Sequence, residues 1–311
     1  MWPTQKGALR LFQFAGVQVY LHWSWFIVAL IEFNNRRGQY SSPLWNVAEY
    51  LALFAIVLLH EFGHALACRQ TGGSANTIVL WPLGGVAYVS PPPRPGATLW
   101  SIAAGPLVNL LLLPISFGLA AMAAAFEWTD TQPNLTHFFS TLVYINTGLL
   151  IFNLMPVYPL DGGQILRSLL WFVIGPWRSL MVATAIGLAG AVALGALALI
   201  NGSLWVGLIA LFMGANCWRA LQHARLLRRV ETAPVRHEFL CPGCQVPPPE
   251  GPFWVCYHCR TAFDTFAAGA VCPNCQHSFP ATHCPRCGTL RPIAEWHRIP
   301  PRLGDARTLT L

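Results

Sequence analysis

Residues 60–64 read HEFGH and lie within an apolar run, residues 50–67, that would otherwise pass for a membrane span. On a helix, residues four positions apart share a face, so the imidazoles of His60 and His64 can bind one metal ion. Glu61 then lies beside the pair, where it can take a proton from a water that the metal activates. Ionisable groups inside a bilayer are costly and are usually functional. The pattern therefore indicates a metal-dependent hydrolase site within a membrane.

A catalytic zinc ion needs a third protein ligand and an open position for water. Asp161 is the candidate, because it follows two prolines and precedes two glycines at the end of an apolar segment, where the chain can turn back toward a neighbouring helix. Alternatively, Asp161 caps the helix that begins near Gln164. The local sequence supports both interpretations equally, and the need for a third ligand favours the metal.

The composition is that of a membrane protein with several spans. Of 311 residues, 54% are hydrophobic and only 10% are charged, against roughly 25% charged in a soluble domain. Lys and Arg together exceed Asp and Glu by 19 to 12, and the basic residues follow the ends of apolar runs. This placement indicates membrane topology and contact with anionic lipid rather than nucleic-acid binding. We find no small-residue cleavage site after the first apolar run and expect that run to be retained.

Six apolar segments are long enough to cross a hydrocarbon core about 30 Å thick. We expect membrane spans at residues 16–33, 48–68, 99–126, 138–156, 179–200 and 203–221. The positive-inside rule then predicts that both termini are cytoplasmic, with Arg36 and Arg37 as exceptions, in a multi-pass protein of the cell membrane. In this orientation His60 lies about 18 Å into a span that is entered from outside.

Residues 77–89 are apolar but too short to cross a membrane. Their β-branched and aromatic content around Pro82 and the Gly84-Gly85 pair favours a strand–turn–strand element, with an interfacial loop as the alternative. Unpaired strands cannot face lipid, so we expect this element to be buried in protein or to line a polar cavity. An edge strand near residues 84–89 could pair with an extended substrate.

The order of these motifs strongly resembles the site-2 protease family of intramembrane zinc metalloproteases. The resemblance covers roughly residues 10–222 and is carried by four elements: the HEFGH motif, the turn at Gly84-Gly85, the segment Gly105-Pro106-Leu107-Val108-Asn109, and the segment from Asn153 through Pro156 to Leu160-Asp161-Gly162. It implies a polytopic α-helical membrane protein with about six transmembrane helices and a small membrane-associated β element. It also implies hydrolysis of peptide bonds in or near transmembrane segments of other proteins, as in regulated intramembrane proteolysis.

Carried over residue by residue, the resemblance implies that His60, His64 and Asp161 bind the catalytic zinc and that Glu61 is the general base. Asn153 could donate a hydrogen bond to the substrate backbone or to the developing oxyanion, or it could bond between helices.

For three further residues of the membrane part we expect mainly structural roles. We expect Asn109 to orient helices or a ligand, and Gly105 to permit close approach of helices. His22 lies near the start of the first expected span, and we favour a structural role for it.

The C-terminal part contains four Cys-x-x-Cys pairs: Cys241 and Cys244, Cys256 and Cys259, Cys272 and Cys275, Cys284 and Cys287. Two such pairs supply four thiolates to a tetrahedral structural zinc, and the whole resembles a double zinc ribbon. A disulfide framework is the alternative, which a reducing cytoplasm disfavours. We expect consecutive pairs to share an ion, with crossed pairing left open, so that the chain binds one catalytic and two structural zinc ions.

The sequence thus predicts a membrane-embedded metalloprotease domain (1–222), an Arg-rich linker (223–240), a double zinc ribbon (241–290) and a C-terminal tail (291–311). The ribbon is expected to bind a protein partner or substrate, and nucleic acid is not expected. Two other functions are open. One is a membrane scaffold that has lost activity, in which Glu61 would not be needed. The other is a transporter that uses the three metal ligands as a relay, which would usually show internal repeats, and we find none.

Overall fold

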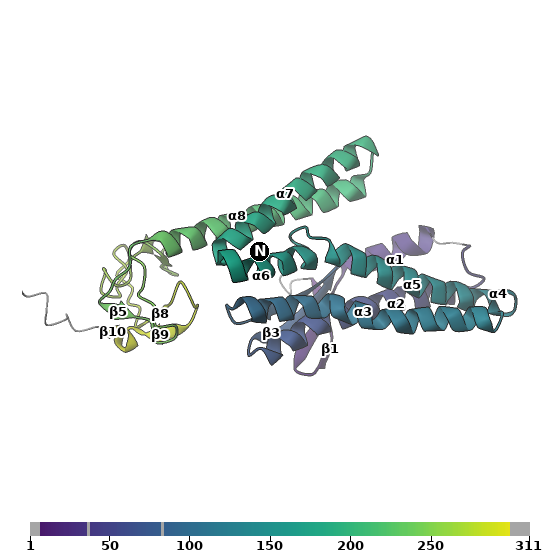
Figure 1. Ribbon diagram of the computed structural model, residues 1–311, viewed down its shortest axis with the longest axis horizontal. Coiled ribbons are helices and arrows are strands. Elements are labelled where there is room, and N and C mark those ends of the chain that lie inside the picture. Colours follow the sequence, from purple (N-terminus) through teal and green to yellow (C-terminus); the bar gives the residue numbers. More distant parts are fainter. Residues whose placement is uncertain (1–6, 36–37, 82–83, 299–311) are drawn as a thin grey trace, which may run out of the picture. The chain divides into compact units, whose positions relative to one another are not determined.

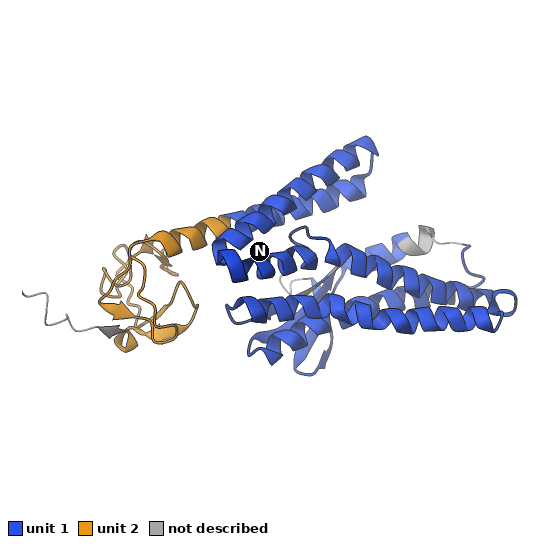
Figure 2. Cartoon of the chain, in the orientation of Figure 1, with its two compact units in different colours: residues 1–221 blue, residues 222–311 orange. Residues whose placement is uncertain are grey.

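The computed structural model describes residues 7–35, 38–81 and 84–298. The chain divides into two compact units, residues 1–221 and residues 222–311 (Figure 2). The first unit contains the HEFGH motif and the second contains all four Cys-x-x-Cys pairs.

Five helices among the described residues are long and apolar enough to span a membrane. They are α2 (Pro43–Gln70), α3 (Pro95–Ala125), α5 (Pro133–Leu154), α7 (Pro176–Ile200) and α8 (Leu204–Thr232). Four of them begin with proline, which is favoured at the first helical position because its missing N–H would have no helical partner there. Two shorter helices, α4 (Trp128–Thr131) and α6 (Asp161–Ile174), lie between the long ones in the sequence.

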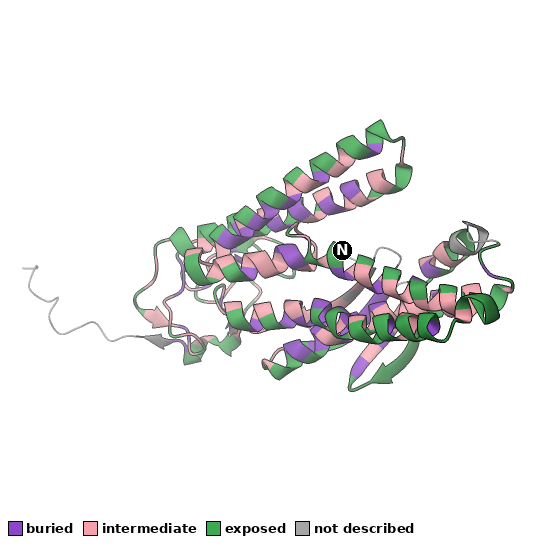
Figure 3. Ribbon diagram, turned by 45° about the vertical axis from the view of Figure 1, so that its right-hand side comes forward, coloured by how far each residue is buried: buried purple, intermediate pink, exposed green. Residues whose placement is uncertain are grey.

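The surfaces of the long helices fit a lipid environment. Buried residues lie where helices and strands meet, and the outward faces are exposed (Figure 3). Those faces are apolar: Leu111 is 62% exposed, Leu199 86% and Leu204 80%. Exposed apolar surface of this extent is rare on soluble monomers and is expected where a helix contacts lipid. The chain is therefore a membrane protein.

Helices α2, α3 and α5 pack together, and α6 packs against α3 and α7 (Figure 1). Gly63 of α2 is one reason that α2 and α3 can approach closely. A Cβ atom at this position would lie 2.6 Å from the carbonyl oxygen of Ala104 in α3. Small residues allow this contact between membrane helices, since only a hydrogen atom separates the two backbones there.

A four-stranded sheet covers part of this helical layer (Figure 1). Its order is β1 (Ala8–Phe14), β2 (Val17–His22), β3 (Ser74–Trp81) and β4 (Gly84–Ser90). Strands β2 and β3 run parallel, and the other two neighbouring pairs are antiparallel. Val17 and Val19 of β2, together with Ile78 and Leu80 of β3, pack in one buried cluster with Phe62 and Ala65 of α2. The sheet is thereby fixed beside the helix that carries the HEFGH motif.

The strand–turn–strand prediction for residues 77–89 is confirmed by β3 and β4, although Pro82 lies outside the described residues. The predicted first span at residues 16–33 is wrong as a single membrane helix. Its first part is β2, and its second part is α1 (Ser24–Asn35), which has only 12 residues. The alternation of Val17 and Val19 with polar residues is a strand pattern, and it outweighs the overall hydrophobicity of the run.

The second unit is built from short antiparallel strand pairs. They are β5 (Phe239–Leu240) with β10 (His297–Arg298), β6 (Trp254–Val255) with β7 (Ala262–Phe263), and β8 (Ala281–His283) with β9 (Leu290–Pro292), followed by the short helix η1 (Ile293–Glu295). Trp296 is 2% exposed and packs edge-on against Phe266, with ring centroids 4.9 Å apart. These aromatic contacts join the two cysteine-rich halves of the unit, whose apolar core is small.

Two segments that flank the cysteine pairs are part of the same unit. Helix α8 continues to Thr232, and Val235 then forms a β-bridge with Pro249. The guanidinium group of Arg236 donates a hydrogen bond to Asp264 Oδ2 at 2.8 Å. Residues 290–298 form β9, η1 and β10. The cysteine pairs are therefore held between segments that come before and after them in the chain.

Candidate metal centre

The structure brings His60, His64 and Asp161 together at the contact between α2 and α6. His60 Nε2 lies 3.0 Å from Asp161 Oδ2, and His64 Nε2 lies 3.4 Å from the same oxygen. The two Nε2 atoms are 3.0 Å apart. Both histidines are buried, being 5% and 6% exposed. One ligand atom from each of the three side chains lies within a group that could hold a single metal ion.

Asp161 does not cap α6. It is the first residue of the helix, the preceding Leu160 is the N-cap, and no side chain makes a capping hydrogen bond there. The glycines that follow explain how the chain can turn so tightly. A Cβ atom at Gly162 would lie 2.3 Å from the carbonyl oxygen of Leu154, and one at Gly163 would lie 2.3 Å from the backbone nitrogen of Tyr158. The carboxylate is thus free of a capping role and faces the two imidazoles.

The outer nitrogens of both imidazoles are engaged by the neighbouring helix α3. His64 Nδ1 lies 2.9 Å from the backbone oxygen of Ser101, and His60 Nδ1 lies 2.5 Å from Asn109 Oδ1. A carbonyl oxygen only accepts, so each Nδ1 carries the proton and donates it. Each Nε2 then presents a lone pair toward Asp161, which is the tautomer that a metal-binding histidine requires.

The donor set fits a catalytic zinc ion. Two imidazole nitrogens and one carboxylate oxygen, all within 4.8 Å of one another, are three of the ligands that zinc takes. Three lone-pair donors this close in a buried site repel one another unless a cation lies between them. Asp161 Oδ2 is buried and makes no hydrogen bond, as expected for a carboxylate oxygen that coordinates a metal ion.

Gly105 of α3 lies directly against the two imidazoles. A Cβ atom at this position would lie 2.3 Å from His64 Nε2 and 2.8 Å from His60 Nε2. Gly105 was expected to allow two helices to pack closely, but the structure shows that it makes room for the two imidazole rings. Its contact is with the ring atoms that face the metal position, and Gly63 makes the close approach to the α3 backbone.

Glu61 is held by the sheet. Its side chain is buried, and Glu61 Oε2 accepts a hydrogen bond of 2.8 Å from the backbone N–H of Ala87 in β4. Gly85, two residues earlier in β4, leaves room for the side chain. A Cβ atom there would lie 2.2 Å from Glu61 Cγ and 2.5 Å from Glu61 Oε1. Strand β4 thus fixes the carboxylate that follows the first histidine.

Asn153 and His22 lie outside this group. Asn153 is half-buried near the end of α5, and its side chain makes no hydrogen bond within the described part of the chain. The His22 ring lies at the end of β2, where its Nδ1 is 2.5 Å from Ser24 Oγ. Its ring centroid is 6.2 Å from that of Trp81. These contacts agree with a structural role for His22.

Two polar groups that contact the site or its neighbours were not predicted from the sequence. The backbone oxygen of Ser101 has no sequence signal, because any residue supplies a carbonyl. Asn146 of α5 is 1% exposed and bonds to Asn109. A signal for Asn146 exists in the sequence, since an amide in the middle of an apolar span is expected to have a polar partner.

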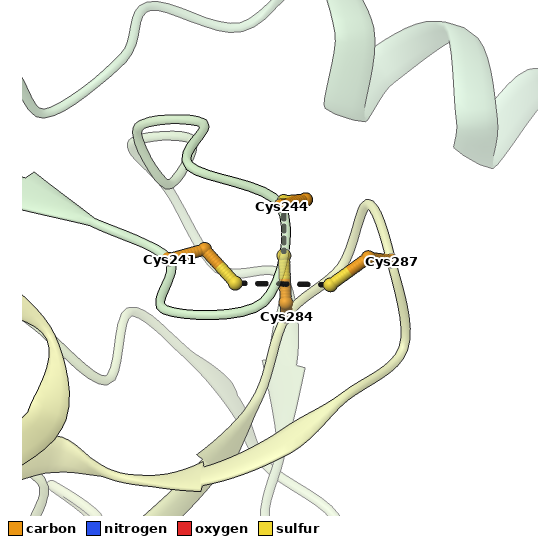
Figure 4. A group of neighbouring side chains, drawn as sticks. All are labelled: Cys241, Cys244, Cys284 and Cys287. Carbon is orange, nitrogen blue, oxygen red and sulfur yellow. Dashed lines mark hydrogen bonds between the residues drawn. The ribbon is translucent and has the colours of Figure 1, made fainter.

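The eight cysteines of the second unit form two groups of four that are nested, not consecutive. One group is Cys241, Cys244, Cys284 and Cys287 (Figure 4), and the other is Cys256, Cys259, Cys272 and Cys275. The dashed lines in Figure 4 join Sγ atoms 3.7 and 3.8 Å apart. None of the eight forms a disulfide bond, so the disulfide framework is not formed.

The expected sharing of an ion by consecutive pairs is therefore wrong. The reason is the pairing of β5 with β10, which are the first and last strands of the unit. This pairing brings the chain just before Cys241 beside the chain that follows Cys287, so the first and fourth cysteine pairs meet. The second and third pairs are left to form the inner group.

Comparison with known proteins agrees with the geometry. Residues 48–131 and 118–197 match the sequence profile of Peptidase family M50. A zinc metalloprotease of Methanocaldococcus jannaschii is 32% identical over 206 residues, which are 66% of this chain and 58% of the relative. The putative zinc metalloprotease Rip3 of Mycobacterium tuberculosis is 29% identical over 68% of this chain and 58% of its own length.

A putative zinc metalloprotease of Synechocystis is 27% identical over 72% of this chain and 62% of the relative. The chain thus spans about three fifths of the length of these curated relatives. Among solved structures, the site-2 protease of Methanocaldococcus jannaschii matches with a TM-score of 0.46 and 27% identity, over 69% of this chain and 95% of that one.

Residues 48–197 match Peptidase family M50, and the expected resemblance to a family of zinc metalloproteases is confirmed. This region includes all three proposed metal ligands and Glu61. The relatives are zinc metalloproteases by name, which implies zinc as the metal of the family.

Proposed function

We propose that this protein is an intramembrane zinc metalloprotease that hydrolyses peptide bonds in or near the transmembrane segments of other membrane proteins. One observation carries the proposal. Two imidazole nitrogens and one carboxylate oxygen converge at a buried position beside α2. Glu61, the residue that follows His60 in this helix, is held by a hydrogen bond from β4. A metal site with an adjacent carboxylate base is the arrangement of a hydrolase.

In this proposal His60, His64 and Asp161 hold the ion, and a bound zinc polarises the scissile carbonyl and acidifies a water molecule. Glu61 accepts the proton of that water and passes it to the leaving amine. The hydrogen bond from Ala87 keeps the carboxylate of Glu61 in one orientation during both transfers. Asn153, which has a free amide at the end of α5, donates a hydrogen bond to the substrate backbone or to the oxyanion.

The substrate enters the site as an extended segment, because the carbonyls of a helix are bonded internally. In the described sheet β4 has one strand neighbour, β3, so its other edge can accept a strand from the substrate. The N–H of Ala87 points to that edge, toward Glu61. The N–H of Val89 faces the same side, since alternate residues of a strand do so. Proline at Val89 is therefore expected to reduce cleavage while zinc binding persists; unchanged cleavage would argue against strand addition.

For the orientation, we propose that both termini are cytoplasmic in the cell membrane. Strand β2 and helix α1, taken end to end, are about 38 Å long, which is enough to cross a hydrocarbon core of about 30 Å. The turn between β1 and β2 lies at the C-terminal end of α2, where Arg69 donates a hydrogen bond to the backbone oxygen of Ala15. That end of α2 carries the basic residue expected on the cytoplasmic side.

The two cysteine groups bind one structural zinc each, so that the chain holds about three ions with the catalytic one. The ribbon presents exposed apolar residues such as Val255 and Tyr257, at 59% and 65% exposure, which suit a protein partner or substrate rather than nucleic acid.

The test is co-expression with a panel of tagged single-span membrane proteins, comparing the wild type with Glu61→Gln. A fragment released only by the wild type is the expected result, and it would also indicate regulated intramembrane proteolysis if the fragment is soluble. A scaffold would be indifferent to Glu61→Gln. Fragment release by both forms would overturn the assignment of Glu61 as the base.

A further inference from the structure

Two fully buried asparagines connect α3 and α5 behind the metal position. Asn109 is 0% exposed and Asn146 is 1% exposed. Asn109 Nδ2 donates to Asn146 Oδ1 at 2.8 Å, and Asn146 Nδ2 donates to the backbone oxygen of Asn109 at 3.0 Å. Asn109 Oδ1 accepts from His60 Nδ1. The hydrogen-bond chain therefore starts at a backbone carbonyl and ends at a proposed zinc ligand.

The direction of every bond in this chain is fixed by that first carbonyl. The backbone oxygen of Asn109 only accepts, so Asn146 must turn its NH₂ group toward it and its oxygen toward the Asn109 side chain. Asn109 must then turn its own NH₂ group toward Asn146 and its oxygen toward His60. His60 Nδ1 has to donate, which leaves the lone pair on Nε2 facing Asp161.

We infer that Asn146 is a positioning residue for the zinc site, acting through Asn109 to hold His60 in its metal-binding tautomer. The inference rests on the proposed zinc site. His64 does not need such a device, because its Nδ1 bonds directly to the backbone oxygen of Ser101. Without Asn146, the Asn109 amide can rotate and present NH₂ to His60. The imidazole must then accept at Nδ1 and carry its proton on Nε2, where it cannot bind a metal.

The partner that orients a metal-binding histidine typically contributes 10- to 100-fold in metal affinity. For Asn146 we expect an effect of this order on zinc, although the residue does not touch a ligand. A residue that only joined α3 to α5 would change the stability of the protein and leave the tautomer of His60 alone.

The experiment measures zinc retention of the purified full chain against a chelator. Asn146→Leu removes both hydrogen bonds at similar volume. Asn216→Leu is the matched control, because Asn216 is also an amide in a membrane helix and donates to a backbone oxygen, that of Phe212. Asn146→Asp is the conservative variant: a neutral carboxyl group buried between apolar helices has one donor and one acceptor in the same arrangement.

We expect Asn146→Leu to lose the ion of the His/Asp site 10- to 100-fold faster than the wild type, while the two cysteine-bound ions of the second unit remain as an internal reference. Asn216→Leu and Asn146→Asp should retain all three ions. Adding Asn146→Leu to Asn109→Leu should have no further effect, because both act on the same tautomer.

Two results would overturn the inference: zinc retention by Asn146→Leu equal to that of Asn216→Leu, or additive effects in the double variant. Failure of the proposed function looks different, because the wild type itself would then hold only the two cysteine-bound ions.

Discussion

The backbone N–H of Ala87 donates a hydrogen bond of 2.8 Å to the carboxylate of Glu61. This bond connects the outer edge of the described β-sheet to the residue next to His60, the first of the proposed zinc ligands. A general base must keep a fixed direction toward the water that it deprotonates, and a buried carboxylate on a single helix turn has several rotamers. Under the proposed mechanism, the sheet therefore orients Glu61 as the base and also provides an edge for the substrate.

The first prediction concerns the space beside Glu61. Gly85→Ala should displace the carboxylate, because the added Cβ would lie 2.2 Å from Glu61 Cγ. We expect cleavage to fall by about 10²-fold, the usual cost of a displacement of about 1 Å at a catalytic group, with zinc content unchanged. Fragment release and metal analysis on the same preparation check this. Gly118→Ala is the control, since a Cβ there meets no atom within 4 Å.

The second prediction concerns Gly105, where the same substitution should act on the metal. A Cβ atom at Gly105 would lie 2.3 Å from His64 Nε2, so alanine must push the imidazoles apart. We expect Gly105→Ala to retain the two cysteine-bound ions and to lose the third. If Gly105→Ala kept three ions per chain, the metal would not lie where these nitrogens converge.

The third prediction tests the nested cysteine groups by counting ions in double Cys→Ser variants. Substituting Cys241 and Cys284 together should remove one structural ion, because both belong to one group. Substituting Cys241 and Cys256 should remove two. Consecutive pairing predicts the opposite: two ions lost from the first variant and one from the second. Native mass spectrometry of the full chain distinguishes these counts.

The proposed catalytic residues were largely identifiable from sequence, because their pattern is local. The spacing of His60 and His64 on one helix face is a property of the helix itself, and Glu61 follows from its place between them. For Asp161 the sequence left capping and metal binding equally open. The fold excludes capping, since Leu160 is the N-cap, and it supports the proposed metal binding because the carboxylate lies beside His60 of α2.

The errors concern long-range pairing. Residues 16–33 were predicted as one span, yet their first part forms β2 because β1 and β3 offer backbone partners on both sides. The nesting of the cysteine pairs depends on the meeting of β5 and β10, which are separated by more than fifty residues. Asn146 was passed over because its partner, Asn109, is on another helix. Local patterns do not contain these contacts.

The fourth prediction concerns the second unit, in which Asp264 accepts hydrogen bonds from Arg236 and from the backbone of Gly251, Phe266 and Ala267. Burial acts to raise the pKa of this carboxyl, but the N–H of Gly251 and the Arg236 guanidinium outweigh it and hold the pKa below the usual value. The stabilisation is therefore present above the pKa of an unfolded aspartate and is lost as the pH falls through the lower, folded-state pKa.

Asp264→Asn should lower the free energy of unfolding of this unit by about 1–3 kcal/mol at neutral pH. The difference from the wild type should shrink as the pH is lowered. Chemical denaturation of the zinc-loaded full chain, followed by tryptophan fluorescence, measures both effects. Glu231→Gln is the control, at an exposed position near the end of α8. Equal stability of Asp264→Asn and Glu231→Gln would refute the role of Asp264.

The most direct measurement of the central claim is made on purified wild type and Glu61→Gln, reconstituted in liposomes with a substrate identified by co-expression. Zinc content and fragment release are determined on the same samples. A zinc site with Glu61 as its base predicts about three ions in both forms, with cleavage only by the wild type. Cleavage by Glu61→Gln at the wild-type rate, or a wild type that cleaves with only two ions bound, would contradict it.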